Sequence, residues 1–188
     1  MMIENENFKS IDYTSQPIQG TEFENCHFDS CNFSEQNLNS IDFMECTFEN
    51  CNLTMTEVEN TAFKDVQFIN CKLTGLDLSK CNSFLFQVSF EGCMLDFVNF
   101  HKRTLKKTLF KNCSIKQAAF IEVDLSESKF YNCDLTESIF ERANLQKADL
   151  RSALNYTINP EINKLKKAKF SVHGLGGLLS NYNIEIEF

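Results

Sequence analysis

The sequence predicts an all-β solenoid that is closed at its C-terminal end by a short helical segment. Two observations carry this prediction: a six-residue stretch returns about every twenty residues, and every fifth residue is apolar over most of the chain. Repetition at a fixed period is typical of solenoids, in which each repeat buries its apolar side chains against its neighbours. The chain of 188 residues is 43% hydrophobic, which is enough for one folded unit.

The recurring stretch is FENCNL at residues 48–53. It returns as FINCKL (68–73), FEGCML (90–95), FKNCSI (110–115) and FYNCDL (130–135), and FDSCNF (28–33) precedes it. One of these steps takes twenty-two residues instead of twenty. A two-residue insertion within 79–85 accounts for the difference.

The apolar period is five residues. All fifteen positions from Phe8 to Leu78 and all fourteen from Leu85 to Leu150 are apolar or aromatic. This period fits neither the 2.0 of a strand nor the 3.6 of a helix. The residue two before most of these centres is small or compact, the residue just before is often Asp or Asn, and the other two are mostly polar. Two positions in five therefore point inward.

This unit resembles the repeat of the pentapeptide-repeat family, whose members wind into a right-handed, four-sided parallel β-helix with one pentapeptide per side. The resemblance implies a coil of twenty residues, about seven coils over residues 6–154, and a separate segment over 155–188. Backbone amides would pair between coils at strand spacing, with the large centres stacked along the axis.

The nine cysteines are expected to be free, buried thiols. Stacking points the Cβ atoms of successive coils alike rather than toward one another, which disfavours disulfides. No CxxC spacing is present and the three histidines lie far apart, so no metal and no cofactor is expected. After correction for the insertion, one side of the solenoid stacks six of these residues: Cys31, Cys51, Cys71, Cys93, Cys113 and Cys133.

No catalytic triad or glycine-rich phosphate motif is present, and we expect a protein that is not an enzyme.

The net charge is −8, with 4 basic and 16 acidic residues in 1–100 but 14 basic and 10 acidic residues in 101–188. The basic cluster 101–107 is short, which favours a solvated face over direct binding of nucleic acid. Without a signal peptide or a long apolar run, a cytoplasmic protein that does not contact membranes is expected.

Arg103 occupies an inward position, where we expect a local bulge or a snorkelling side chain. Candidate partner-binding residues gather near the insertion, where exposed aromatic rings could contact another protein or could fold against the enlarged corner. These candidates are Ser79, Lys80, Asn82, Phe84, Phe86 and Phe97.

The repeat fades after Leu150. Asn159 and Pro160 predict the start of a short helix, a second helical stretch is expected around 172–180, and alternation at 184–188 predicts a strand. The Asn-Tyr, Ile-Asn-Pro and Lys-Lys-Ala-Lys-Phe-Ser elements are similar to the tail of the Qnr-like quinolone-resistance group. That resemblance implies a homodimer through the C-terminal ends, against the alternative of a monomer whose tail is a cap. The interface candidates are Leu175, Leu178, Leu179 and Ile184.

The same resemblance implies a function. Qnr-like proteins bind type II topoisomerases, DNA gyrase or topoisomerase IV, and protect them from quinolones or peptide toxins, in one mechanism by mimicking duplex DNA. The alternative is an interaction scaffold for another protein partner, because the fold alone does not decide what its surface binds.

Overall fold

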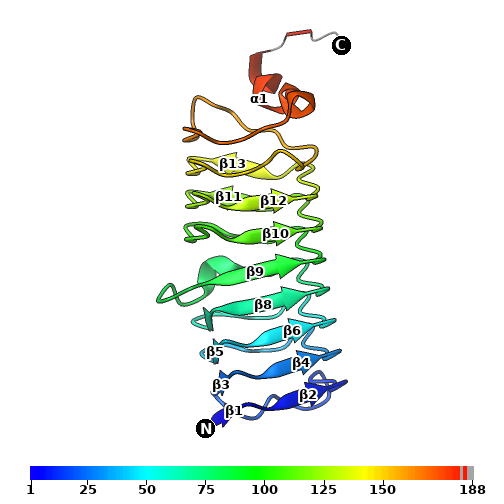
Figure 1. Ribbon diagram of the computed structural model, residues 1–188. Helices are drawn as coiled ribbons and strands as arrows, with labels where there is room; N and C mark the ends of the chain where they lie inside the picture. The colour runs from blue at the N-terminus through cyan, green and yellow to red at the C-terminus, as the bar shows by residue number, and fades with distance from the viewer. Residues whose placement is uncertain (183, 186–188) are drawn as a thin grey trace.

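The computed structural model describes residues 1–182 and 184–185 of a single rod. The chain enters at one end, climbs coil by coil, and finishes in short helical turns at the other end (Figure 1). The rod is a right-handed, four-sided parallel β-helix of about seven coils, which confirms the predicted fold class. Among the described residues, no helix is long and apolar enough to cross a bilayer.

We number the four sides of the coil 1 to 4 in chain order. The lower half of side 1 is a parallel ladder of β1 (Met2–Glu4), β3 (Glu22–Glu24), β5 (Asp42–Met44) and β7 (Ala62–Lys64). Side 2 is the longest ladder, formed by β2 (Asn7–Lys9), β4 (His27–Asp29), β6 (Thr47–Glu49), β8 (Val66–Ile69), β9 (Val88–Glu91), β10 (Leu109–Lys111) and β12 (Lys129–Tyr131).

Side 3 is joined by single bridges from Asp12↔Asn32 up to Asp134↔Leu154. Side 4 has similar bridges and one regular pair, β11 (Ala119–Ile121) with β13 (Ile139–Glu141). The register is constant, so that each centre lies on the centre of the next coil, as in Phe28↔Phe48. Side chains of one column therefore follow the rod axis.

The core is a stack of these centres. Phe28 and Phe48 stack with ring centroids 4.7 Å apart and planes 9° from parallel, and Phe43 meets Phe48 edge to face at 5.2 Å. Aromatic rings prefer these two arrangements because of their quadrupole. The nineteen phenylalanines of the sequence serve mainly as this repeated filling.

All nine cysteines are free and buried. Each thiol in the stack on the corner before side 3 donates weakly to backbone carbonyls, as Cys51 Sγ does to Phe28 O at 3.2 Å. Burial raises the pKa of Cys46 and that of Cys81 to about 12.

We therefore expect the native protein to resist thiol reagents. At pH 8, a colourless disulfide reagent that releases a chromophore should titrate almost no thiol in the folded protein and nine in 6 M guanidinium, because buried protonated thiols react poorly. Rapid titration of several thiols without denaturant would contradict this burial.

Most corners of the coil adopt the left-handed backbone conformation with a residue other than glycine. Nearly every fifth residue has positive φ, for example Glu45 at 53°, Asp65 at 55° and Lys107 at 62°, and only positions 20, 75 and 92 of these are glycine. This conformation is unfavourable for residues with a Cβ atom. Here it aims the corner N–H along the axis, as in the bond from Asn25 N to Met44 O of the next coil at 2.9 Å.

The coil continues past the expected boundary at 154, which is a correction. Bridges Asn144↔Lys164 and Asp149↔Lys169 keep the same register. The expected helix at Pro160 is wrong: residues 160–162 form a turn, in which Asn159 Oδ1 accepts from Glu161 N at 2.9 Å. An Asn-Pro cap serves a turn as well as a helix.

The tail beyond Phe170 is helical, as expected for 172–180. It consists of η2 (Val172–Gly174), α1 (Gly176–Leu179) and η3 (Ser180–Tyr182), shown at the C-terminal end of the rod in Figure 1. Ile184 is in no regular element, and Ile186 and Phe188 of the predicted strand lie outside the described residues.

Candidate partner-binding surface

The insertion forms a projection from an otherwise regular rod. Between Leu78 and Gln87 the chain makes a 3₁₀ turn, η1 (Leu78–Lys80), and a loop that stands out sideways before β9 (Figure 1). Asp77 caps the turn by accepting from Ser79 N at 3.2 Å, and Asn82 Oδ1 accepts from Phe84 N at 2.9 Å. Ser79 and Asn82 thus shape the backbone of the projection.

Two neighbours in this loop exchange the roles that the five-residue period predicts. Leu85 was predicted to be an inward centre and the position of Phe86 was left open, but Leu85 is 65% exposed and has φ 55°, whereas Phe86 is buried. The two extra residues let the chain turn so that the ring enters the core. We call residues 82–85, which include the exposed Phe84, the knob.

Arg103 explains why Phe86 turns inward. Its side chain is buried, its Nη1 donates to Cys81 O at 2.8 Å, and its guanidinium carbon lies 5.6 Å from the centre of the Phe86 ring. Such stacking of a cation on a ring is favourable, more so away from water. Arg103 points inward as predicted, but it neither snorkels nor bulges. The bulge is one coil below it and makes room for the guanidinium.

Replacing this arginine should loosen the knob. We expect Arg103→Ala to lose about 2–3 kcal/mol of unfolding free energy, because it leaves a cavity and a buried carbonyl without a donor. Chymotrypsin should then cut faster at Phe84. Arg142→Ala is the matched control, since that side chain is exposed and pairs with Glu122 at 3.0 Å on the surface. Equal cutting rates in both variants would contradict the anchoring role.

The knob carries exposed apolar surface. Phe84 is 67% exposed, and beneath Leu85 a shallow hollow of about 340 Å³ is lined by Met44, Lys64 and Asp65 among others. Met44 itself is exposed. Neither Leu85 nor Met44 was among the predicted candidates: Leu85 was assigned to the core, and a single outward methionine gives no signal in the sequence.

Phe97 does not join the knob. It is 58% exposed at the corner between sides 3 and 4, in the same column as Met55 and Gly75. In the cross-section of the coil, side 4 lies between the corner that carries Phe97 and residues 82–85. Of the two possibilities left open by the sequence, Phe86 folds against the enlarged corner, whereas Phe84 and Phe97 are exposed and offer two separate surfaces.

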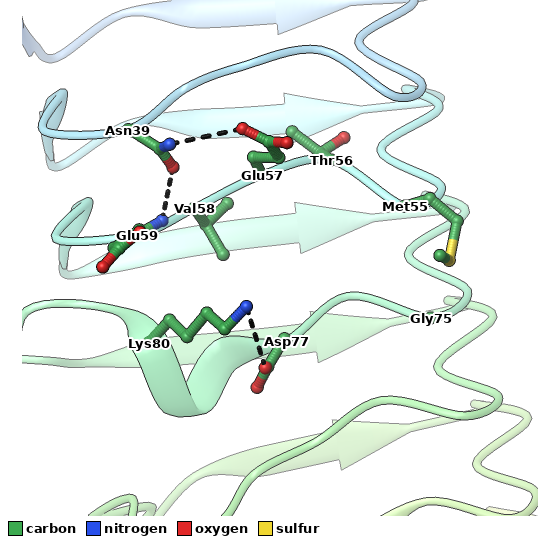
Figure 2. A pocket seen from close by; sticks show the side chains of 9 residues that line it. All are labelled: Asn39, Met55, Thr56, Glu57, Val58, Glu59, Gly75, Asp77 and Lys80. Atoms are coloured by element: carbon green, nitrogen blue, oxygen red, sulfur yellow. Dashed lines mark hydrogen bonds and ion pairs between the residues drawn. The ribbon is translucent and has the colours of Figure 1, made fainter.

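An acidic hollow lies on side 4 beside η1. Figure 2 shows Asn39 bridging its wall, with Nδ2 3.3 Å from Glu57 Oε2 and Oδ1 2.6 Å from Glu59 N. Lys80 lies at the rim, 3.7 Å from Asp77. The hollow has about 270 Å³ and is open, and no cluster of three metal-ligating side chains occurs in the part of the chain that the structure describes. It suits a basic side chain of a partner better than a metal ion.

The family follows from the match between this repeat and known profiles. The profile described as "Pentapeptide repeat region" matches residues 21–100 and 83–157, which is most of the chain. The chain belongs to the pentapeptide repeat family. No curated protein sequence matches it significantly.

Solved pentapeptide repeat structures share the fold at low sequence identity. Full-length QnrB1, a plasmid-mediated fluoroquinolone resistance protein, is 17% identical with a TM-score of 0.64, over 98% of this chain and 100% of that one. HetL, involved in heterocyst differentiation regulation in the cyanobacterium Nostoc sp. strain PCC 7120, is 16% identical with a TM-score of 0.67, over 93% and 86%. These likenesses establish the architecture and leave the surface to be interpreted.

The C-terminal segment of this pentapeptide repeat protein is docked on the last coil. Ile158 N donates to Gly177 O at 2.9 Å, and Leu178 packs against the core. Leu179 is half-buried, while Leu175 and Ile184 are exposed. The segment therefore covers the end of the rod, and it leaves two of the four predicted interface side chains facing solvent.

Proposed function

We propose that the protein binds a type II topoisomerase, DNA gyrase or topoisomerase IV, without catalysing a reaction, and protects it from quinolones or toxins. The observation that carries the proposal is a rod with an acidic N-terminal half, 16 acidic against 4 basic residues, next to the exposed apolar knob. The overall likeness to QnrB1, named as a fluoroquinolone resistance protein, supports it.

The acidic half could compete with DNA for a cationic surface. Outward carboxylates recur along the axis at the coil spacing of ~4.8 Å, and duplex phosphates recur at ~3.4 Å along each strand. Lysine and arginine side chains arranged for DNA would therefore meet rows of negative charge on the rod. The knob would add desolvated apolar contact, which long-range charge alone does not supply. We further propose that two copies join end to end through Leu175, Leu178, Leu179 and Ile184, which doubles the rod.

A scaffold for an unrelated protein is the second candidate. Phe97 and Met55 are exposed apolar side chains at a corner away from the knob, and residues 101–188 are basic on balance. HetL, with the same architecture, is named for a regulatory role.

A gyrase titration tests the first proposal. Added protein should restore supercoiling in the presence of a quinolone and reduce drug-stabilised DNA cleavage. The double variant Phe84→Ala/Leu85→Ala should require about ten-fold more protein for the same effect, because it removes the exposed apolar contact.

Phe97→Ala is the matched control, an exposed ring on another corner, and should act like the wild type. No effect of the folded wild-type protein on either gyrase or topoisomerase IV would refute the proposal and favour the scaffold. A loss of protection with Phe97→Ala, but not with the double variant, would indicate that the contact lies at the corner of Phe97 and not at the knob.

A further inference from the structure

On side 1, most acidic side chains lie in the N-terminal half of the rod and most basic side chains lie in the C-terminal half. Below the knob, side 1 consists of strands β1, β3, β5 and β7 and their corners. Above the knob, it consists of residues 104–107 and the segments stacked on them. Both groups belong to side 1 because each directly precedes the side 2 ladder in its coil. The lower half presents six carboxylates, with Lys64 as its one cationic side chain: Glu4, Glu22, Glu24, Asp42, Glu45 and Asp65. The upper half presents six lysines, with Asp124 and Glu127 as its anions: Lys106, Lys107, Lys147, Lys164, Lys166 and Lys167.

Most of these charges form no ion pair with another residue that the structure describes. Asp42 pairs with Lys64 at 2.7 Å, and Lys147 pairs with Glu127 at 3.8 Å. The other five carboxylates and five lysines form no ion pair within residues 1–182 and 184–185. They are mostly well exposed.

Charged side chains are arranged differently on the other sides of the coil. On side 2, neighbouring coils neutralise each other, as in Lys9 with Asp29 at 3.3 Å and Lys111 with Glu91 at 2.6 Å. Local pairing of this kind leaves little for a partner to recognise. The separation on side 1 is thus a property of that side and not a consequence of the coil geometry.

The apolar knob lies at the middle of this charge pattern. Four centres of side 1 lie below it, Ile3, Phe23, Phe43 and Phe63, and four lie above it, Leu105, Leu125, Leu145 and Leu165. A two-fold axis through the knob, perpendicular to side 1, would bring the acidic half of each copy over the basic half of the other. Phe84 and Leu85 of both copies would meet near the axis, as apolar centres with charged rims do in interfaces.

We propose that side 1 is an interface between two copies of this chain, packed side by side and antiparallel. The face is about 40 Å long and about 12 Å wide, so each copy buries on the order of 500 Å², less than the ~800 Å² of a standard interface. The association is therefore weak and sensitive to salt. It is separate from the end-to-end contact proposed above and does not depend on topoisomerase binding.

Charge reversal followed by mixing tests the arrangement. The wild type at 10–500 µM (about the range for so small an interface) is followed by sedimentation equilibrium at low and high salt. Lys164→Glu/Lys166→Glu/Lys167→Glu and Glu4→Lys/Glu22→Lys/Glu24→Lys should each weaken self-association about ten-fold. An equimolar mixture of the two variants should regain it, because every reversed half then faces a reversed half. Lys72→Glu/Lys129→Glu, on other sides, is the control and should change nothing.

A zero-length carboxyl–amine cross-linker gives an independent result. Glu4 and Lys166 lie at opposite ends of one rod, about 40 Å apart by coil spacing, but are adjacent in the proposed dimer. A Glu4–Lys166 peptide from the wild type would support the arrangement. A monomer at all salt concentrations, or self-association unaffected by both reversals, would overturn it, and the second result would leave only the C-terminal contact.

Discussion

Phe110→Ala should unfold the rod more readily than any surface change. Phe110 is fully buried, stacks on Phe90 at 5.3 Å and Phe130 at 4.7 Å, and meets Phe100 and Phe120 edge to face. Removing the ring leaves a void that rigid stacked neighbours cannot fill. We expect a loss of about 3–5 kcal/mol in the free energy of unfolding, measured by urea denaturation followed by circular dichroism.

Tyr131→Ala is the control for this change. Tyr131 is an exposed aromatic residue one position from the Phe130 centre, and its removal should cost less than about 0.5 kcal/mol. Similar losses in the two variants would mean that the stacked rings contribute no more than a surface side chain. That result would be incompatible with the core described above.

Gly177→Ala should detach the C-terminal segment from the last coil. A Cβ atom at this position would lie 2.0 Å from the backbone carbonyl oxygen of Tyr156, a contact that only a shift of the segment can relieve. Because Ile158 N donates to Gly177 O, the shift would also break that bond. We expect trypsin to remove the tail at least about five-fold faster, since cleavage follows the population of the open form.

The neighbouring glycine supplies the comparison. A Cβ atom on Gly176 meets nothing within 4 Å, so Gly176→Ala should keep the wild-type rate or slow cleavage through better helix propensity. Cleavage of Gly177→Ala no faster than that of Gly176→Ala would show that the close contact with Tyr156 does not hold the tail.

The five-residue period predicted a solenoid and nearly every buried centre, because the size of the side chain at one position decides whether coils can stack. The four-sided form of the coil came from the family resemblance. The period did not identify the buried residue where two neighbouring apolar residues could each serve as the centre. At the insertion, Leu85 and Phe86 are both apolar, and the choice depends on Arg103, which lies a full coil later in the chain. No local pattern contains that information.

The C-terminal boundary was misplaced for a related reason. Asn155 and Pro160 occupy centre positions without being apolar, so the pattern ends in the sequence while the coil continues. Tyr156 and Ile158 are buried there instead, and Asn163 supports the coil by bonding Phe140 O at 2.9 Å. Outward sites such as Met44 were missed because exposure of a single residue depends on its neighbours in the adjacent coils.

The constant register also limits how such a rod can change in length. Inserting twenty residues above the knob would lengthen it by one coil, ~4.8 Å, and leave every side chain on its original side. Inserting a single pentapeptide at the same place would turn everything above it by a quarter of a revolution. The lysines of side 1 would then face a different direction from the acids below, although no residue had been replaced. For this protein, an insertion of twenty residues preserves which side chains share a side of the rod, whereas an insertion of five residues rearranges them.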